Sequence, residues 1–147
     1  MNTKLLSNIF NTNDSTSTLP LRVIAGIIFA AHGAQKLFAW FGGYGLEGTG
    51  QWMDSIGLSP GFIMALMAGS AEFFGGLLLI LGLLTRPAAA VLAITMVVAI
   101  FTVHFSNGLF MSNNGYEFAL ALFAITIALV IQGGGKFSVD KVISKQL

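Results

Sequence analysis

The stretch LPLRVIAGIIFAAHGAQKLFAWF, residues 19–41, is apolar enough and long enough to cross a lipid bilayer as a helix. A hydrocarbon core about 30 Å thick is crossed by about 20 helical residues. The stretch nevertheless contains Arg22, His32, Gln35 and Lys36. Because ionisable groups that face lipid are costly, we expect these side chains to face other helices or a water-filled cavity.

The helical period places several of these side chains on one face. At about 100° per residue, Arg22, His32, Lys36 and Trp40 fall within about a quarter of the helix circumference. A polar stripe of this kind requires partner helices that cover it. The sequence therefore predicts a bundle of membrane-spanning helices rather than a single anchor.

The composition agrees with a multi-pass membrane protein whose first partner is the lipid bilayer. Of 147 residues, 55% are hydrophobic and only 9% are charged, whereas about 25% are charged in ordinary soluble domains. The net charge of +1, without a basic cluster, argues against a nucleic-acid partner. The absence of cysteine excludes disulfides and cysteine-ligated iron–sulfur clusters.

We predict an all-α membrane protein, a bundle of four transmembrane helices. The expected spans are about 19–41, 62–84, 88–105 and 116–131, within a transmembrane domain over residues 19–132. Residues 1–18 are interpreted as a mobile cytoplasmic tail, and residues 133–147 as a cytoplasmic C-terminal tail. The glycine-rich stretch 42–59 is expected to be an external loop, too interrupted by glycine for a helix throughout.

The distribution of positive charge predicts that both termini are cytoplasmic. Lys4 precedes the first span and Arg22 lies near its inner end. Arg86 lies between the second and third spans, and three lysines follow the fourth. The other two connections carry only acidic charges, as the positive-inside rule expects of outer loops. Lys36, near the outer end of the first span, is the exception.

Ionisable residues in the outer half of the bundle are the candidate functional groups. Glu72 is the most informative, because a carboxylate at that depth must be protonated, paired or hydrated. His32, one turn from Lys36 on the same face, can titrate near neutral pH. Glu72, His32 and Glu117 are therefore the candidate catalytic residues, and a second group is predicted to bind substrate: Lys36, His104, Gln35, Trp40 and Trp52.

Each of these residues also has a purely structural interpretation. Lys36 could extend to the outer interface, and His104 and Glu117 could be ordinary polar residues at helix ends. The two tryptophans could belong to the interfacial aromatic belt, as Arg22 could be an inner anchor. Two histidines with Glu72 and Glu117 could instead ligate a non-haem metal, although no helical metal motif is present and we predict no metal.

The motifs together resemble the DoxX family over about residues 19–140. They are His32-Gly33-Ala34-Gln35-Lys36-Leu37-Phe38, the glycine-rich loop with Trp52 and Gly57, Glu72 before Gly75-Gly76, Gly82 to Arg86, His104, Glu117 and the final Gly-Gly-Gly-Lys-Phe-Ser. The resemblance implies a four-helix protein of the bacterial cytoplasmic membrane. The family is named after a subunit of an archaeal terminal quinol oxidase and is related to thiosulfate:quinone oxidoreductase subunits, but resemblance defines architecture better than reaction.

The resulting hypothesis is a quinone-linked oxidoreductase, or a subunit of one, that binds a quinone or similar small redox-active molecule in an intramembrane polar pocket. Lys36 or His32 would hydrogen-bond a carbonyl group, and Glu72 with Glu117 would exchange the accompanying proton. No flavin, haem or iron–sulfur site is recognisable, so a soluble or membrane partner would supply the electrons. The alternatives are a small-solute transporter or permeability factor, and a non-catalytic anchor for a soluble redox enzyme. A homo-oligomer is also compatible with the faces of small residues on the second span (Ala65, Ala68, Gly69, Gly75 and Gly76) and on the fourth (Ala121, Ala124 and Ala128).

Overall fold

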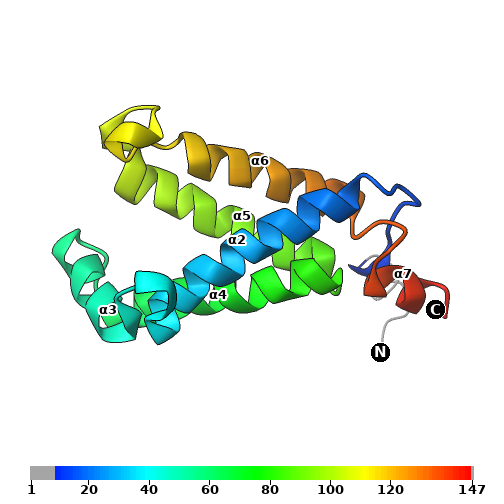
Figure 1. Cartoon of the computed structure of the whole chain (residues 1–147), viewed down its shortest axis with the longest axis horizontal. Helices are drawn as coiled ribbons and strands as arrows, with labels where there is room; N and C mark the ends of the chain where they lie inside the picture. Colours follow the sequence, from blue (N-terminus) through cyan, green and yellow to red (C-terminus); the bar gives the residue numbers. More distant parts are fainter. Residues whose placement is uncertain (1–8, 147) are drawn as a thin grey trace.

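The computed structural model describes residues 9–146, and every regular element in that range is helical (Figure 1). The longer helices are α2 (Thr18–Phe38), α3 (Gly45–Ser55), α4 (Gly61–Leu81), α5 (Thr85–Ala99), α6 (Glu117–Gln132) and α7 (Val139–Ser144). The shorter turns are η1 (Trp40–Gly42), η2 (Ile100–His104), η3 (Phe105–Asn107) and η4 (Met111–Asn113).

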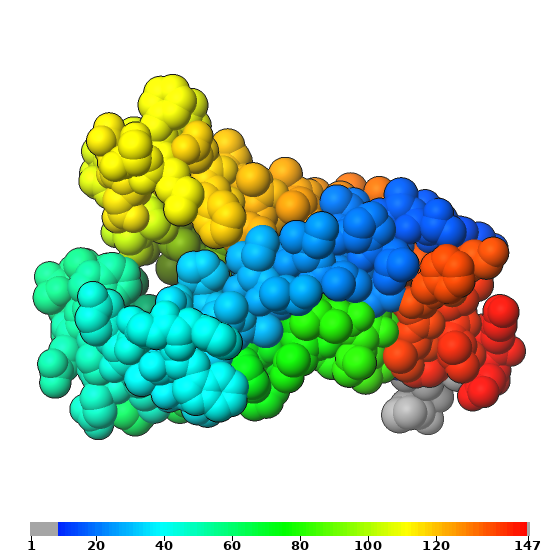
Figure 2. Space-filling model, in the orientation of Figure 1, coloured from blue at the N-terminus to red at the C-terminus, as the bar shows by residue number. Residues whose placement is uncertain are grey.

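The helices are arranged as two pairs that diverge toward one end of the molecule. In Figure 1, α2 lies along α4 and α5 lies along α6, with α3 beside the start of α4. The pairs approach each other near α7 and separate toward α3 and the connection between α5 and α6. The space-filling view shows a hollow between these two regions (Figure 2).

Within residues 9–146, three helical segments are long and apolar enough to cross a membrane: α2, α4 and the continuous segment from residue 85 to residue 107. The all-helical membrane class is thereby confirmed. With 16 residues, α6 is shorter, and a fourth crossing stays a prediction. Residues 9–17 and α7 lie at the same end of the bundle (Figure 1), but which side of the membrane that end faces is a prediction only.

The boundaries of the second and third apolar helices differ from the expected spans. Gly82, in the left-handed conformation at φ 66°, ends α4 at Leu81. Residues 85–87 are the first turn of α5 rather than a connecting turn. Pro87 is tolerated there because the first backbone N–H groups of a helix have no partner within the helix.

The stretch expected to be an irregular outer loop contains the helix α3, which corrects the sequence interpretation. Glycines on both sides of the contact permit close packing. A Cβ added to Gly50 of α3 would lie 3.0 Å from Phe62 Cα, and one added to Gly61 of α4 would lie 2.0 Å from the carbonyl oxygen of Gly50. Asp54 accepts hydrogen bonds from the Ser59 hydroxyl at 2.7 Å and the Gly61 N–H at 2.8 Å, which together lower the pKa of its carboxyl. Contact with α4 therefore outweighs the low helix propensity of glycine.

The contact between α2 and α4 brings their backbones together. A Cβ added to Gly33 would lie 2.3 Å from the backbone nitrogen of Phe73, and one added to Gly76 would lie 2.5 Å from that of Ala30. Small residues at such positions are the usual basis of tight helix packing in membranes. The small-residue face expected on the second span thus packs against α2.

The narrow end of the bundle is closed by buried polar groups. Arg22 is 2% exposed, and its guanidinium donates hydrogen bonds to the carbonyl groups of Leu79, Ile80, Gly134 and Phe137. Instead of a free interfacial anchor, Arg22 is a buried connection between α2, α4 and the C-terminal segment.

Asp140 and the N-terminal residues complete this end. The Asp140 carboxylate is 1% exposed and accepts hydrogen bonds from the N–H groups of Leu84 at 2.7 Å and Thr85 at 2.8 Å, which caps α5. Residues 1–8 of the expected mobile tail lie outside the described residues. Further along, the Asn11 carbonyl accepts a hydrogen bond from Arg86, and the Ser15 carbonyl accepts one from the backbone of Lys136.

Replacing Gly33 with alanine should destabilise the protein by about 1–3 kcal/mol, because a Cβ there meets backbone atoms that cannot move away. Gly75→Ala is the matched control, since its Cβ would meet only the flexible Leu92 side chain at 3.1 Å. Thermal unfolding of both variants in detergent measures the difference. Equal melting temperatures would show that the backbones of α2 and α4 are not in contact.

Asp140→Ala should leave the buried Thr85 N–H and the part-buried Leu84 N–H without acceptors, at a cost of about 1–3 kcal/mol for the buried group. The control is Asp14→Ala, which removes the exposed partner of Lys141 and should leave the melting temperature unchanged. The measurement is again thermal unfolding in detergent. An unchanged melting temperature for Asp140→Ala would contradict the assigned cap of α5.

Candidate functional site

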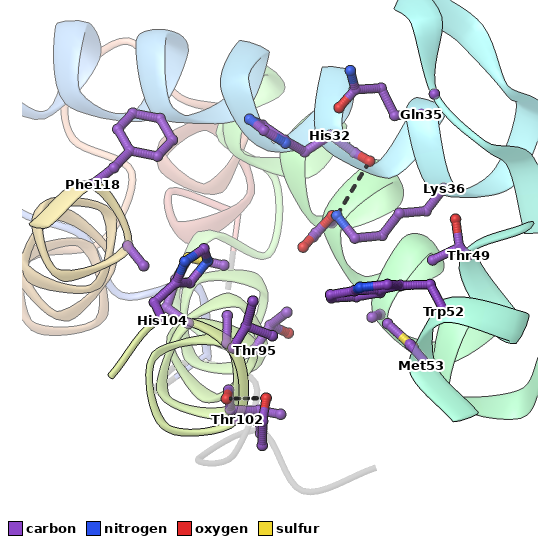
Figure 3. A pocket seen from close by; sticks show the side chains of 18 of the residues that line it. His32, Gln35, Lys36, Thr49, Trp52, Met53, Thr95, Thr102, His104 and Phe118 are labelled. Carbon is purple, nitrogen blue, oxygen red and sulfur yellow. Dashed lines mark hydrogen bonds and ion pairs between the residues drawn. The ribbon is translucent and has the colours of Figure 1, made fainter. Parts of the chain in front are cut away.

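A cavity of about 890 Å³ lies between the two helix pairs, bordered at its wide end by α3 and the α5–α6 connection (Figures 2 and 3). It brings together six of the eight residues that the sequence singles out. They are His32, Gln35, Lys36, Trp52, Glu72 and His104. Residues from α2, α3, α4 and η2 therefore meet at one site.

The only ion pair of the site among residues 9–146 joins Lys36 and Glu72. The Lys36 Nζ lies 2.6 Å from Glu72 Oε2, and the Glu72 residue is 5% exposed while the Lys36 side chain is 23% exposed. A Cβ added to Gly69 would lie 2.8 Å from Leu37 Cδ2 and 3.2 Å from Lys36 Cβ, so the absence of a side chain at Gly69 makes room for both residues. The pair satisfies a carboxylate that would otherwise be buried without a partner.

His32 lies one turn before Lys36, and its ring is exposed at the cavity wall. The ring centroid is 6.2 Å from that of Phe118 on α6. Within residues 9–146, neither ring nitrogen has a hydrogen-bond partner, whereas the His32 carbonyl lies 3.5 Å from Lys36 Nζ. The imidazole is therefore available to a bound molecule.

His104 reaches the cavity from the opposite pair of helices (Figure 3). It ends η2, a π-helical segment that continues α5. Its Nδ1 lies 2.9 Å from the carbonyl oxygen of Asn114 in the α5–α6 connection. His104 is thus held between a distorted helix end and a loop.

Two of the predicted site residues do not line the cavity. Glu117 accepts a hydrogen bond from the Met111 N–H at 2.6 Å and so holds the α5–α6 connection. Trp40 packs against Phe38 and Phe41, with ring centroids 5.1 and 6.4 Å away. Both residues support neighbouring segments instead of facing the site.

Gln35 both lines the cavity and holds the chain that leaves α2. Its side-chain amide donates a hydrogen bond to the Phe41 carbonyl at 3.2 Å. A Cβ added to Gly43 would lie 2.4 Å from the Gln35 carbonyl oxygen. The end of α2 and the start of α3 are therefore closely joined beside the site.

Several polar lining residues were not anticipated. They are Tyr44, Thr49, Thr95, Thr102 and Asn114. Thr95 and Thr102 are seven residues apart and thus share a helix face, a signal that the apolar character of the third span concealed. Both hydroxyl groups donate to carbonyl groups of their own helix, so their oxygen atoms can still accept hydrogen bonds.

The remaining wall is apolar, and the cavity is therefore amphiphilic. Phe29, Met96 and Leu122 lie deeper in the bundle than Lys36 and His104, and they present carbon and sulfur surface. A pocket that combines such a wall with a few polar groups is typical of small-molecule sites, whose volumes are about 300–1,000 Å³. It can hold an apolar ring while it hydrogen-bonds polar atoms at one end.

The metal alternative has no geometric support. Within the part of the chain that the structure describes, no three His, Asp or Glu side chains lie close enough to hold a metal ion. Glu72 is paired with Lys36, and Glu117 lies outside the cavity lining.

Comparisons with known proteins support this architecture. The chain is 41% identical over 119 residues to "Putative oxidoreductase CatD" of Bacillus subtilis, which covers 81% of this chain and 82% of the relative. It is 31% identical to "Inner membrane protein YqjF" of Escherichia coli over 90% of this chain and 96% of the relative. It is also 31% identical to "Uncharacterized membrane protein Rv3486" of Mycobacterium tuberculosis, over 88% and 83% of the two chains.

No solved structure matches this chain. The model of the DoxX family matches residues 17–105, which is more than half of the chain and includes α2 to η2. With its apolar helices and its membrane-protein relatives, the chain is a multi-pass protein of the bacterial inner membrane. It belongs to the DoxX family.

Proposed function

We propose that the cavity binds a quinone or a similar small redox-active ring as part of a membrane oxidoreductase system. The observation that carries this proposal is the Lys36–Glu72 ion pair on the wall of an amphiphilic cavity. The name of the Bacillus subtilis relative, an oxidoreductase, agrees with a redox role.

Lys36 is the hydrogen-bond donor of the proposed site. Its ammonium group has three N–H bonds, of which one serves Glu72 and another points at the His32 carbonyl. The third can donate to a ligand carbonyl. A hydrogen bond from a charged donor in a site of low dielectric is stronger than one between neutral groups.

Glu72 and His32 are the proposed proton-exchanging groups. Reduction of a quinone to a hydroquinone takes two electrons and two protons. Both residues line the cavity, and within residues 9–146 neither nitrogen of the His32 ring has a protein hydrogen-bond partner. The sequence also suggested Glu117 for proton exchange. Because its carboxylate binds the Met111 N–H of the α5–α6 connection, Glu117 is not assigned that role here.

The electrons are proposed to come from a partner, either a membrane subunit or a soluble redox enzyme. The chain has no cysteine that could ligate an iron–sulfur cluster. The protein would then position the ring and move protons, while the partner carries the electrons.

Lys36→Met should weaken binding of decylubiquinone by about 10–100-fold, because it removes a charged hydrogen-bond donor. Trp52 lines the cavity and is one of two tryptophans, so Trp40→Phe leaves a single reporter whose fluorescence a bound quinone should quench. Titration of this background in detergent measures the affinity.

The double variant Lys36→Met/Glu72→Gln is the control for stability. Lys36→Met alone leaves the buried Glu72 carboxylate unpaired and should lower the melting temperature, whereas the double variant should regain it. Binding should stay weak in both. Undiminished affinity in the double variant, or no quenching in the parent protein, would overturn the proposed function.

A further inference from the structure

The position of His104 in the cavity depends on an irregular helix. The cavity-lining residues Met96 and Ala99 on α5 and Val103 in η2 follow the spacing of an α-helix. His104 lies five residues after Ala99, and in a regular α-helix it would point about 140° away from it. Residues Ile100–His104 form a π-helix, in which groups five residues apart become hydrogen-bonded neighbours. The π turn therefore brings His104 onto the cavity face.

The hydrogen bond of His104 defines which ring nitrogen carries the proton. Its Nδ1 lies 2.9 Å from the Asn114 carbonyl oxygen. Because a carbonyl oxygen can only accept, Nδ1 is the donor. In the neutral imidazole the lone pair then lies on Nε2.

The loop that supplies this carbonyl is held tightly. Asn114 has the left-handed conformation at φ 60°, and its carbonyl also accepts a hydrogen bond from Asn107 Nδ2 at 3.3 Å. A Cβ added to Gly115 would lie 2.3 Å from the Gly108 carbonyl oxygen. Glu117 binds the Met111 N–H in the same loop, which makes it a positioning residue for this arrangement.

We infer that His104 Nε2 is a hydrogen-bond acceptor in the cavity and that the ligand donates a ring hydroxyl to it. This inference rests on the proposed function and specifies the hydroquinone as the form of the ligand that binds. Lys36 and His104 lie on opposite walls (Figure 3), so the site pairs a donor with an acceptor. A quinone offers only acceptors and leaves Nε2 unsatisfied, whereas the hydroxyl groups of a hydroquinone can serve both walls.

The direct test is nitrogen NMR of protein labelled with ¹⁵N-histidine in detergent micelles. The chain has only two histidines, so a His32→Gln variant assigns both rings. At a pH where the ring is neutral, His104 should show a protonated Nδ1 and an unprotonated Nε2 before any ligand is added. Addition of decylubiquinol should shift the Nε2 resonance, and its dimethyl ether, which has no hydroxyl hydrogen, should not. A ring protonated at Nε2, or equal shifts with both compounds, would overturn the inference.

Binding supplies the second readout. In the Trp40→Phe background, decylubiquinol should bind about five- to tenfold more tightly than its dimethyl ether, as expected for one hydrogen bond. His104→Phe should remove this preference, and His104→Gln, whose amide oxygen can accept, should retain part of it. If the hydroxyl form and the ether bind equally to the parent protein, the inference fails while the proposed function stands. If neither the quinone nor the hydroquinone binds, the proposed function fails and this inference fails with it.

Discussion

The backbone contact between α2 and α4 is the constraint on which the site depends. Because Gly33 and Gly76 carry no side chains, the two helices approach closely enough for Lys36 to reach Glu72 across their interface. An ion pair at this depth has to be short and well aligned, since the cost of removing two charges from water is offset only by good geometry. Separated helices would leave a buried carboxylate without a partner. The Lys36–Glu72 ion pair therefore depends on the close packing of α2 against α4.

The two ends of the bundle differ in how their polar side chains use their hydrogen-bonding capacity. At the narrow end, Arg22 and Asp140 are buried and directed at backbone groups, so their hydrogen-bonding capacity is used within the fold. At the wide end, His32 and the third N–H of Lys36 are left available. A closed end makes the divergence of the helix pairs possible, since it holds the four helices together where the cavity does not separate them.

The sequence predicts the helical membrane class and most of the ionisable residues that line the cavity for a simple reason. An ionisable residue within an apolar span must have a partner, so Glu72, Lys36 and His32 are conspicuous without any knowledge of the fold. Glu117 and Trp40 are equally conspicuous, but a position along a helix does not specify whether a terminal residue faces a cavity or a loop. Helix α3 was missed because its glycines lower helix propensity, and their packing against α4 is a tertiary effect.

At the π turn that follows α5, the α-helical period no longer predicts which residues share a helix face. A strict α-helical period places Thr95 and Thr102 together and excludes His104 from their face. In the structure His104 nevertheless lines the cavity, because the π-helical turn Ile100–His104 is wider than an α-helical turn. The Asn114 carbonyl of the α5–α6 connection holds its ring there. An irregular turn lacks the hydrogen-bond regularity of its neighbours and persists where surrounding contacts compensate for it. Here one such contact is the Asn114 carbonyl, which lies in the same loop that Glu117 binds through the Met111 N–H. A residue outside the cavity lining thus contacts the loop that holds one inside it.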